Sequence, residues 1–354
     1  MTDTKKYLVD HRLNIREGIK KMDEVGIGFM VVTEEDDRII GVFTDGDFRK
    51  AILKGVSLDD SILKIANRDF KQLGPGYTEA EAREMFDGTI VHQVPVIEKG
   101  TLLEVILKSD MSFKNAGPMV HGQLDLPVVI MAGGKGTRLE PFTHILPKPL
   151  IPINDKPIVE IIIDEYRKYG IEQFYLSVNH KSKMIKAFFE DQTVDYTIEY
   201  IEEDKPLGTA GSLKLVNQEI KTPFFVSNCD ILIREDYTKI HEFHVNGDFE
   251  LTMVASMQHY SIPYGVCEIN SDGELLEIKE KPGFDFLVNT GMYLLNPGTL
   301  DHIPTDELFN MTDLIGVLQE KNFKVGVYPV SEKSYMDIGQ WAEYKKVVKS
   351  FGNS

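Results

Sequence analysis

The sequence of 354 residues predicts an α/β protein with a mainly parallel sheet, preceded by a smaller α/β unit. Three observations support this prediction. From about residue 127 onward, apolar runs typical of strands alternate with segments of helical periodicity, as in βαβ units. Before residue 117, two segments of about 50 residues repeat one order of elements. The chain is also long enough for two domains.

The repeat is expected at residues 1–116, as copies at about 1–58 and 59–116. Each copy should contain a helix, two strands and a second helix. A stretch without sustained period, rich in glycine and proline, predicts a linker at 117–126. The expected elements are Asn14–Val25, Phe29–Thr33, Ile39–Phe43 and Asp47–Leu53, then Glu79–Phe86, Gln93–Ile97, Leu102–Leu107 and a short helix from Ser109.

Residues 127–354 are expected to form the larger domain. It begins with the apolar run Val128–Ala132, which is typical of a buried strand. Strands and helices should then alternate, with helices on both faces of the sheet and ligands at the carboxyl ends of the strands. The expected helices are Ile158–Tyr169, Lys181–Phe189 and Thr209–Val216, and the expected strands are Gln173–Val178, Tyr196–Ile201, Phe224–Cys229 and Lys324–Val330.

Composition limits the classes of partner. A hydrophobic content of 42% with 27% charged residues is typical of a soluble globular protein. The net charge of −17 argues against nucleic acid and anionic membranes as partners. No apolar run approaches the roughly 18 residues of a membrane span, and the first residues lack the apolar stretch of a signal peptide. Cys229 and Cys267 have no metal-ligand spacing, so we interpret both as reduced packing residues in the cytoplasm.

A glycine-rich loop follows the first strand of the larger domain. Glycines directly after a strand let backbone N–H groups face an anion, and nearby cations suit a polyphosphate. A Walker loop needs Gly-Lys-Ser/Thr, which is absent, and the third glycine of a dinucleotide fingerprint is replaced by Leu139. A solvated turn is the alternative. The expected phosphate site comprises Ala132, Gly133, Gly134, Gly136 and Thr137, with Arg138 and Lys148 as cations.

The full pattern, A-G-G-x-G-T-R-L-x-P-x-T followed by P-K-P, resembles the signature of sugar-1-phosphate nucleotidyltransferases. The resemblance implies a Rossmann-like sheet of the GT-A type. It also implies transfer of a nucleoside monophosphate from an NTP to a sugar 1-phosphate, with release of pyrophosphate. Arg138 would hold the leaving pyrophosphate, and Lys148 would bridge the two reacting phosphates.

The segment Glu203–Gly211 joins a predicted strand to a predicted helix. Glycine permits close backbone approach, and a helix N-terminus favours an anion or a base edge. In the resembled family this loop faces the nucleobase, and Pro-Leu-Gly-Thr-Ala-Gly is similar to the guanylyltransferase version. GTP is therefore expected, with UTP or CTP as alternatives. A plainer explanation of the glycines in this segment is that they allow tight packing. The expected nucleotide contacts here are Glu203, Gly208, Thr209 and Ala210.

Two aspartates follow predicted strands. Asp230 comes directly after the predicted strand Phe224–Cys229, and Asp337 follows the predicted strand Lys324–Val330. A buried carboxylate is costly unless it is paired or bound to metal, and Mg²⁺ is held by one or two carboxylates with phosphate and water. The resemblance implies that both aspartates bind Mg²⁺. Capping a helix is the alternative for either residue.

Three short motifs match the sugar side of the resembled site. Asp, Glu and Asn side chains suit vicinal hydroxyls because they accept or donate hydrogen bonds in pairs. A surface salt bridge between the Glu and Lys of the second motif is the alternative. The motifs are Tyr264-Gly265-Val266, Glu280-Lys281-Pro282 and Val288-Asn289-Thr290, from which Gly265, Glu280, Lys281, Asn289 and Thr290 are the expected contacts.

The first N-terminal copy resembles a CBS motif through Gly41-Val-Phe-Thr44-Asp-Gly-Asp47, and the two copies resemble a CBS tandem. The resemblance implies an adenine or guanine nucleotide at Thr44 and Asp47, and dimerisation through the pair. A helix cap is the alternative. The second copy departs from the pattern, with Glu104 at the glycine position and Leu107 at the threonine position.

A CBS tandem before this transferase resembles the enzymes that make GDP-glucosamine for bacterial nonulosonic (legionaminic) acid, a surface glycan. Glucosamine 1-phosphate is therefore the expected sugar, with mannose 1-phosphate or a heptose 1-phosphate as alternatives. The rival from another class is a non-catalytic regulatory subunit that senses nucleotide. Such a subunit tends to lose site residues, whereas Arg138, Lys148, Asp230, Lys281 and Asp337 are all present.

Overall fold

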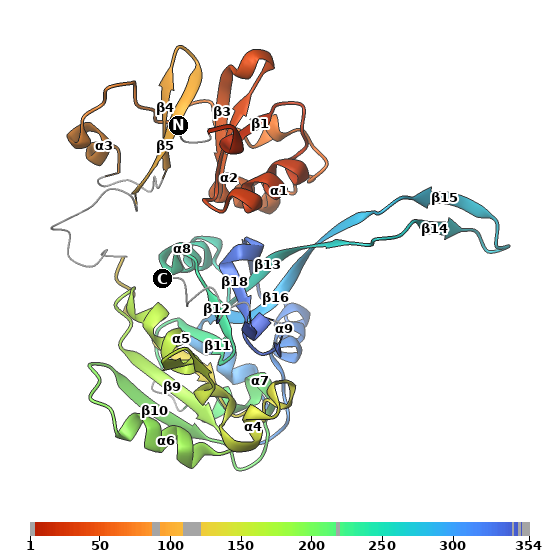
Figure 1. The fold of residues 1–354 in the computed structure, drawn as a ribbon. Helices are drawn as coiled ribbons and strands as arrows, with labels where there is room; N and C mark the ends of the chain where they lie inside the picture. Colours follow the sequence, from red (N-terminus) through yellow and green to blue (C-terminus); the bar gives the residue numbers. More distant parts are fainter. Residues whose placement is uncertain are drawn as a thin grey trace. The chain divides into compact units, whose positions relative to one another are not determined.

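The computed structural model describes residues 4–86, 93–108, 122–216, 220–341, 343–345 and 348. The chain divides into two compact units, residues 1–117 and 118–354 (Figure 1). The short helix expected from Ser109 lies outside the described residues, as does the first half of the expected linker. Among the described helices, none combines the length and apolar character that crossing a membrane requires.

The N-terminal unit contains two similar small sheets. In the first, β1 (Leu8–Asp10) pairs in parallel with β2 (Phe29–Thr33), which pairs antiparallel with β3 (Ile39–Thr44). In the second, Leu73 forms a parallel bridge to β4 (Gln93–Glu98), which pairs antiparallel with β5 (Thr101–Leu107). The two halves therefore share one strand arrangement, as an internal repeat requires.

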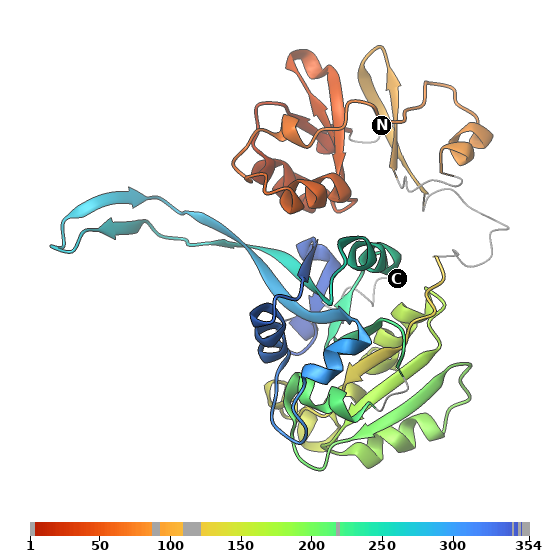
Figure 2. The same ribbon diagram turned by 180° about the vertical axis from the view of Figure 1, so that it is seen from behind.

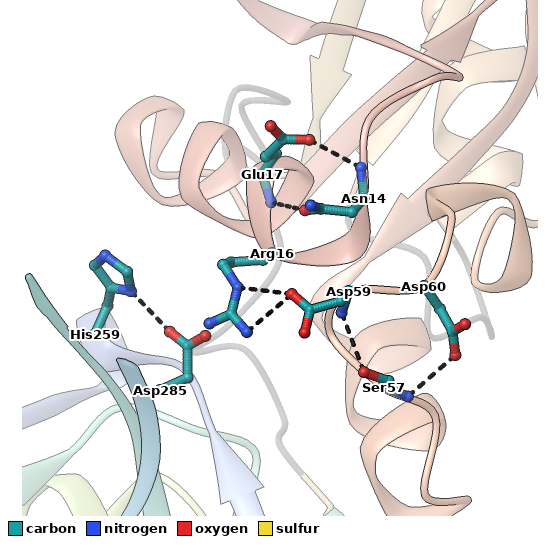
Figure 3. A network of polar contacts seen from close by, with 8 residues as sticks. All are labelled: Asn14, Arg16, Glu17, Ser57, Asp59, Asp60, His259 and Asp285. Atoms are coloured by element: carbon teal, nitrogen blue, oxygen red, sulfur yellow. Dashed lines mark hydrogen bonds and ion pairs between the residues drawn. The ribbon is translucent and has the colours of Figure 1, made fainter. Parts of the chain in front are cut away.

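Within the described residues of this unit, the α-helices beside these sheets are α1 (Ile15–Val25), α2 (Asp45–Leu53) and α3 (Glu79–Phe86). Helix α1 begins where Asn14 and Glu17 exchange the two hydrogen bonds of a capping box, at 2.9 and 3.0 Å (Figure 3). The two halves share a core cluster that joins side chains of both sheets. Its buried members are Phe29, Val31, Val42 and Leu102.

The larger unit is built on a seven-stranded sheet in the order β10-β9-β6-β11-β16-β13-β17. The first four strands are mutually parallel, β13 and β17 are parallel to each other, and β16 runs antiparallel to both of its neighbours. The mainly parallel sheet is therefore confirmed, with one reversed strand that the sequence did not indicate. The strands are β6 (Val128–Met131), β9 (Gln173–Val178), β10 (Thr197–Glu202), β11 (Phe224–Asn228), β13 (Leu251–Ser261), β16 (Gly283–Leu295) and β17 (Val325–Val330).

Side chains of this sheet alternate between two hydrophobic cores, one on each face. In β6, Val128 and Ile130 face the first core and Val129 faces the second. Helices cover both faces, as expected (Figure 2). The first core is covered by α5 (Ile158–Arg167), α6 (Ser182–Glu190) and α8 (Tyr237–Gly247), and the second by α7 (Gly208–Gly211), η7 (Ser212–Leu215) and α9 (Met311–Glu320).

A long two-stranded ribbon extends from this sheet. Strands β13 and β16 remain paired as far as Ser261 and Gly283, and the hairpin of β14 (Val266–Ile269) and β15 (Leu275–Lys279) continues from them. Figures 1 and 2 both show the ribbon projecting away from the sheet. Cys267 is exposed on it, so its interpretation as a packing residue is wrong, whereas Cys229 is buried as expected.

Candidate active site

The glycine-rich loop begins at the carboxyl end of β6 and is held closely by its neighbours. Gly136 has φ of 67°, and a Cβ there would lie 2.8 Å from Cβ of Lys148 and 2.9 Å from Cγ2 of Thr143. Only glycine fits both the backbone conformation and the space. The hydroxyl of Thr143 donates to the carbonyl of Gly136 at 3.1 Å. The loop therefore carries Lys148 directly against its own backbone.

The same loop is open at its centre. A Cβ on Gly134 would meet nothing within 4 Å, and the neighbouring Lys135, Thr137 and Arg138 are exposed. Gly133, by contrast, faces the carboxylate of Glu203, from which a Cβ would lie 2.9 Å. The loop thus has one packed side and one side that is accessible to a ligand.

A compact charge cluster lies beside this loop. The ammonium of Lys148 lies 2.5 Å from Oδ2 of Asp230, and these side chains are only 12% and 7% exposed. The guanidinium of Arg138, which is 62% exposed, lies 3.8 Å from the same oxygen. The structure therefore brings together the two cations and the first aspartate that the sequence selected.

The second aspartate joins the cluster through a short strand pair. Strands β12 (Ile231–Ile233) and β18 (Tyr335–Asp337) pair antiparallel, and the N–H of Ile338 donates to the carbonyl of Asp230 at 2.7 Å. A Cβ on Gly339 would lie 2.1 Å from Oδ2 of Asp230 and 3.0 Å from Oδ1 of Asp337. Both carboxylates therefore face one small volume that any larger side chain would fill.

These residues fit a magnesium ion. Carboxylate oxygens are hard donors, and one or two of them commonly hold Mg²⁺ together with phosphate and water. Asp337 keeps its orientation because Oδ1 accepts from the N–H of Gly339 at 2.9 Å and Oδ2 from the amide of Gln340 at 3.0 Å. Within the described residues no group of three acidic, His or Cys side chains is gathered. Non-protein ligands would have to supply the remaining positions.

Two aromatic residues near the charge cluster, Tyr335 and Trp341, were not among the residues predicted from the sequence. Burial, with added repulsion from the charges of Asp337 and Asp230, raises the pKa of Tyr335 well above its usual value, so its hydroxyl stays protonated. The indole of Trp341 donates to the carbonyl of Glu140 at 2.8 Å, which connects the segment after Asp337 to the residues that follow the glycine-rich loop. Their only sequence signal is their position on either side of Asp337.

Glu203 is engaged at both carboxylate oxygens. The hydroxyl of Ser177 donates to Oε1 at 2.5 Å, and the N–H of Leu207 donates to Oε2 at 3.0 Å. The amide of Asn179 donates to the Glu203 carbonyl, also at 2.5 Å. Glu203 therefore orients the segment after β10, and its contact with a nucleotide stays a prediction.

The loop expected to read the base packs on the segment before α9. Gly208 has φ of 83°, and a Cβ there would lie 2.6 Å from the carbonyl oxygen of Phe309. That oxygen accepts from the N–H groups of Ala210 and Gly211 at 3.0 and 2.9 Å, while the hydroxyl of Thr209 accepts from the N–H of Met311 at 2.9 Å. Tight packing, the plainer explanation of these glycines, is thus present.

The helix expected over Thr209–Val216 is in fact the four-residue α7 followed by the 3₁₀ turn η7. The donors of Ala210 and Gly211 are already satisfied by Phe309, so they are not free to bind an anion at a helix N-terminus. The segment expected to contact the base therefore has fewer N–H groups available for hydrogen bonds to a ligand than the sequence predicted.

The structure does not bring the first two sugar motifs to the charge cluster. A Cβ on Gly265 would lie 3.1 Å from Oε2 of Glu280, so these two residues are neighbours. They lie on the projecting ribbon, however, where the continuous pairing of β13 and β16 keeps the chain extended. At about 3.4 Å per residue, Gly283 is about 20 Å from Asn289, and Lys281 lies farther out. The roles expected for Gly265, Glu280 and Lys281 as sugar contacts therefore stay predictions.

The third sugar motif forms a β-bulge. The hydroxyl of Thr290, a residue only 3% exposed, donates to the carbonyl of Val254 at 2.7 Å and accepts from the N–H of Met292 at 3.2 Å. Asn289 donates to the hydroxyl of Tyr293 at 2.7 Å. The expected role of Thr290 as a sugar contact does not agree with this burial, because its hydrogen bonds are used inside the bulge.

In the N-terminal unit, Thr44 and Asp47 are engaged with each other. The hydroxyl of Thr44 donates to the Asp47 carboxylate at 2.8 Å, and the two residues complete the capping box of α2. A cavity of about 520 Å³ elsewhere in this unit is lined by other residues, among them Asp10, Arg12 and Lys21. The helix-cap explanation is therefore present, and nucleotide binding at Thr44 and Asp47 stays a prediction.

Comparison with known proteins gives two family matches. A model described as nucleotidyl transferase matches residues 127–353, and a model described as CBS domain matches residues 4–54. The chain is 32% identical over 247 residues to a UTP–glucose-1-phosphate uridylyltransferase of Synechocystis sp., with 63% of each chain covered. It is 28% identical over 221 residues to a D-glycero-alpha-D-manno-heptose 1-phosphate guanylyltransferase of Campylobacter jejuni, covering 62% of this chain and 97% of that one.

Coverage differs between these relatives. The chain spans 63% of the uridylyltransferase and 60% of a mannose-1-phosphate guanyltransferase of Debaryomyces hansenii, to which it is 32% identical. Among solved structures, HddC from Yersinia pseudotuberculosis is 27% identical with a TM-score of 0.50, over 64% of this chain and 99% of that chain. The same protein has been solved in complex with GMP-PN.

Proposed function

Because the chain belongs to the nucleotidyl transferase family and carries a CBS domain, we propose that it transfers a nucleoside monophosphate from an NTP to a hexose 1-phosphate. A phosphate oxygen of the sugar forms a bond to the α-phosphorus as the bond from that phosphorus to pyrophosphate breaks. The products are an NDP-sugar and pyrophosphate. No covalent intermediate with the protein is needed, so positioning and charge stabilisation suffice.

The gathering of Arg138, Lys148, Asp230 and Asp337 beside the open centre of the glycine-rich loop supports this proposal most directly. Arg138 is exposed and would contact the leaving pyrophosphate, whereas Lys148 is nearly buried and paired with Asp230. Lys148 would contact the α-phosphate and the incoming sugar phosphate, because its position between loop and carboxylate is fixed. Two cations at one site neutralise charge that develops on phosphate oxygens.

Asp230 and Asp337 would hold Mg²⁺ as the cofactor. When bound, the ion would polarise phosphate oxygens and offset their negative charge. Of the nucleotide contacts, Gly134 and Thr137 belong to the accessible side of the loop, and Ala132, Gly133, Gly136 and Glu203 belong to its packed side. We therefore assign direct phosphate contact to the first group and loop support to the second.

For the nucleotide we propose GTP, and for the sugar glucosamine 1-phosphate. The GTP proposal is supported by the sequence motif Pro-Leu-Gly-Thr-Ala-Gly, by the guanylyltransferases among the relatives and by the complex of the similar protein HddC with GMP-PN. The named relatives act on glucose, mannose and heptose 1-phosphates, which stay as alternatives together with UTP and CTP. Glucosamine 1-phosphate rests on the CBS-transferase combination alone. Gly265, Glu280, Lys281 and Asn289 stay predictions from resemblance.

Pyrophosphate release with Mg²⁺ over a matrix of four NTPs and several sugar 1-phosphates tests the proposal. We expect one strong combination, GTP with glucosamine 1-phosphate. Strong turnover with UTP or CTP would retain the reaction and overturn the base assignment. Turnover with mannose or heptose 1-phosphate would overturn the sugar assignment. No turnover with any combination, with and without added adenine and guanine nucleotides, would favour the non-catalytic subunit.

The remaining expectations are proposals of the same kind. We propose that the N-terminal unit binds an adenine or guanine nucleotide, that the protein forms a homodimer, and that it acts in the cytoplasm. Free thiols at both cysteines agree with a reducing compartment. Equilibrium dialysis of the full chain with ATP, AMP, GTP and GMP, with Thr44→Ala as the comparison, tests the first proposal.

A further inference from the structure

One carboxylate oxygen of Asp230 belongs to both halves of the charge cluster. Oδ2 of Asp230 lies 2.5 Å from the ammonium of Lys148. The same oxygen faces Gly339, where a Cβ would lie 2.1 Å from it and 3.0 Å from Oδ1 of Asp337. A cation shared by the two aspartates would therefore have to contact the oxygen that Lys148 already holds.

The four side chains of the cluster balance one another in charge. Lys148 and Arg138 lie within 4 Å of Asp230, and Asp337 supplies the second negative charge beside it. Tyr335 adds no charge, because burial and the repulsion of both aspartates raise the pKa of its hydroxyl. A divalent cation gains little attraction from a group of charges whose sum is zero. The nucleotide-free cluster is thus a poor cation site, although its oxygens are suitable ligands.

Burial makes Lys148 the stronger of the two internal cations. The side chains of Lys148 and Asp230 are 12% and 7% exposed, whereas Arg138 is 62% exposed and lies 3.8 Å from Asp230. Solvent screens an exposed charge, and a nearly buried pair is screened much less. The first part of the Lys148 side chain is packed, because a Cβ on Gly136 would lie 2.8 Å from its Cβ and 3.2 Å from its Cγ. An exchange of partners therefore involves only the ammonium end.

We propose that Lys148 is an internal counter-ion, which excludes a divalent cation from Asp230 until a phosphate of the nucleotide takes over its ammonium. This inference rests on the proposed function and adds an order of binding to it. Charge-assisted hydrogen bonds to phosphate compete with the ion pair for the ammonium. Asp230 would then be a nearly buried carboxylate without its partner, which is costly unless a cation pairs with it. Nucleotide and cation should therefore strengthen each other's binding by the same factor.

The alternative is a purely structural ion pair, in which Lys148 stays on Asp230 and orients it whether or not nucleotide is bound. The two explanations differ in the effect of removing the lysine charge. An internal counter-ion competes with the cation, so its removal should raise cation affinity. A structural partner holds the carboxylate in place, so its removal should leave cation affinity unchanged or lower it.

The experiment measures Mn²⁺ binding to the nucleotide-free full chain by the electron paramagnetic resonance of the free ion. Mn²⁺ takes the same oxygen ligands as Mg²⁺. The test variant is Lys148→Met, and the matched control is Lys135→Met, which removes the same charge from an exposed position of the same loop. We expect Mn²⁺ affinity to rise about tenfold in the test variant, a typical size for coupling between two ligands. The control should change it by about threefold or less, because solvent screens an exposed charge.

A further variant locates the bound ion. Adding Asp230→Asn to Lys148→Met should abolish the rise in affinity, because the carboxylate that Lys148 occupied is then absent. Circular dichroism checks that each variant is folded. Equal Mn²⁺ affinity in wild type and folded Lys148→Met would overturn the proposal, as would an equal rise in Lys135→Met. These measurements need no nucleotide, so a failure of turnover with every NTP would overturn the proposed function and leave them unaffected.

The unmodified chain gives a second measurement, which does not depend on the folding of Lys148→Met. Mn²⁺ binding to wild type is compared at saturating GMP and at saturating guanosine, or with the corresponding pair for whichever base supports turnover. Association of Mn²⁺ with the nucleotide alone is measured without protein and subtracted. Only the monophosphate can draw the ammonium from Asp230, so Mn²⁺ should bind about tenfold more tightly with it. Equal affinity with nucleotide and nucleoside would overturn the proposal.

Discussion

Lys148 and Asp230, 82 residues apart in the sequence, form an ion pair of 2.5 Å in which both side chains are nearly buried. The pair joins the segment after the glycine-rich loop to the carboxyl end of β11. Removing one partner from such a pair leaves an uncompensated buried charge, which is strongly destabilising. The proposed catalytic roles of these two residues are therefore coupled to stability.

We expect Asp230→Asn to lower turnover about 10³-fold, because a metal carboxylate contributes several kcal/mol to the transition state. The variant should also lose about 3 kcal/mol of unfolding free energy, since Lys148 stays buried without its partner. Pyrophosphate release and urea unfolding measure the two effects. Asp191→Asn, at an exposed helix end, is the control.

Adding Lys148→Met to Asp230→Asn separates the two effects. The double variant should regain part of the lost stability, because no buried charge remains unpaired, and should stay inactive. If stability losses simply added, the ion pair would contribute nothing beyond its separate residues. Near-normal turnover of Asp230→Asn would contradict the metal assignment.

Gly208→Ala should destabilise the protein by about 1–3 kcal/mol, because φ of 83° is strained for alanine and the new Cβ would lie 2.6 Å from the Phe309 carbonyl oxygen. The same change should weaken binding of the nucleotide, as the loop must move. Thermal unfolding and isothermal titration with GTP measure both. Gly298→Ala, where a Cβ meets nothing within 4 Å, should change neither.

Stability should fall as pH is lowered below about 6.5, the ordinary pKa of histidine. Burial lowers the pKa of His244, whose ring lies between the Thr252 hydroxyl at 2.9 Å and the Asn296 side chain at 3.1 Å. The unfolded chain then binds the proton first, so stability is present above the unfolded pKa and lost below it. Burial lowers the pKa of His241 in the same direction.

Thermal midpoints at pH 5 and pH 7.5 test this dependence. His244→Gln should have a lower midpoint at pH 7.5 and a smaller difference between the two pH values. An unchanged difference in this variant would assign the pH dependence to His241 or to carboxylates.

Thiol reagents should modify one cysteine per folded chain at pH 8 and low protein concentration. Burial raises the pKa of the Cys229 thiol to about 12, so its reactive thiolate is scarce as well as inaccessible. Cys267 is exposed and should react. Peptide mapping after alkylation identifies the site, and modification of Cys229 before unfolding would contradict the buried position.

Local signals were enough to predict much of the fold. The bounds of β2, α3 and β9 agree with the sequence, because each is a short run with clear period and clear limits. The charge cluster was predictable as well, because Lys148, Asp230 and Asp337 each belong to a motif or follow a strand. Parallel strands bring their carboxyl ends to one edge of a sheet, so separate motifs meet there.

Features that depend on distant pairing were not predictable. The bulge at Thr290 exists because β16 pairs with β13 in a shifted register, which no local pattern in either strand indicates. The ribbon was missed for the same reason, since its length is set by pairing across more than twenty residues. The short polar motifs at Gly265 and Glu280 are typical of loops. Nothing in them indicates that the surrounding chain is held in an extended ribbon.

The carbonyl of Phe309 accepts from two N–H groups of the loop after β10, across a separation of about a hundred residues. Replacing the loop after β10 alone with that of a uridylyltransferase would therefore change the two N–H donors and leave the Phe309 carbonyl that accepts from them unchanged. The uridylyltransferase's counterpart of residues 307–310 would have to accompany the loop. We therefore expect the substrate range to change when the loop after β10 and residues 307–310 are exchanged together. Exchange of the loop alone should have little effect on it.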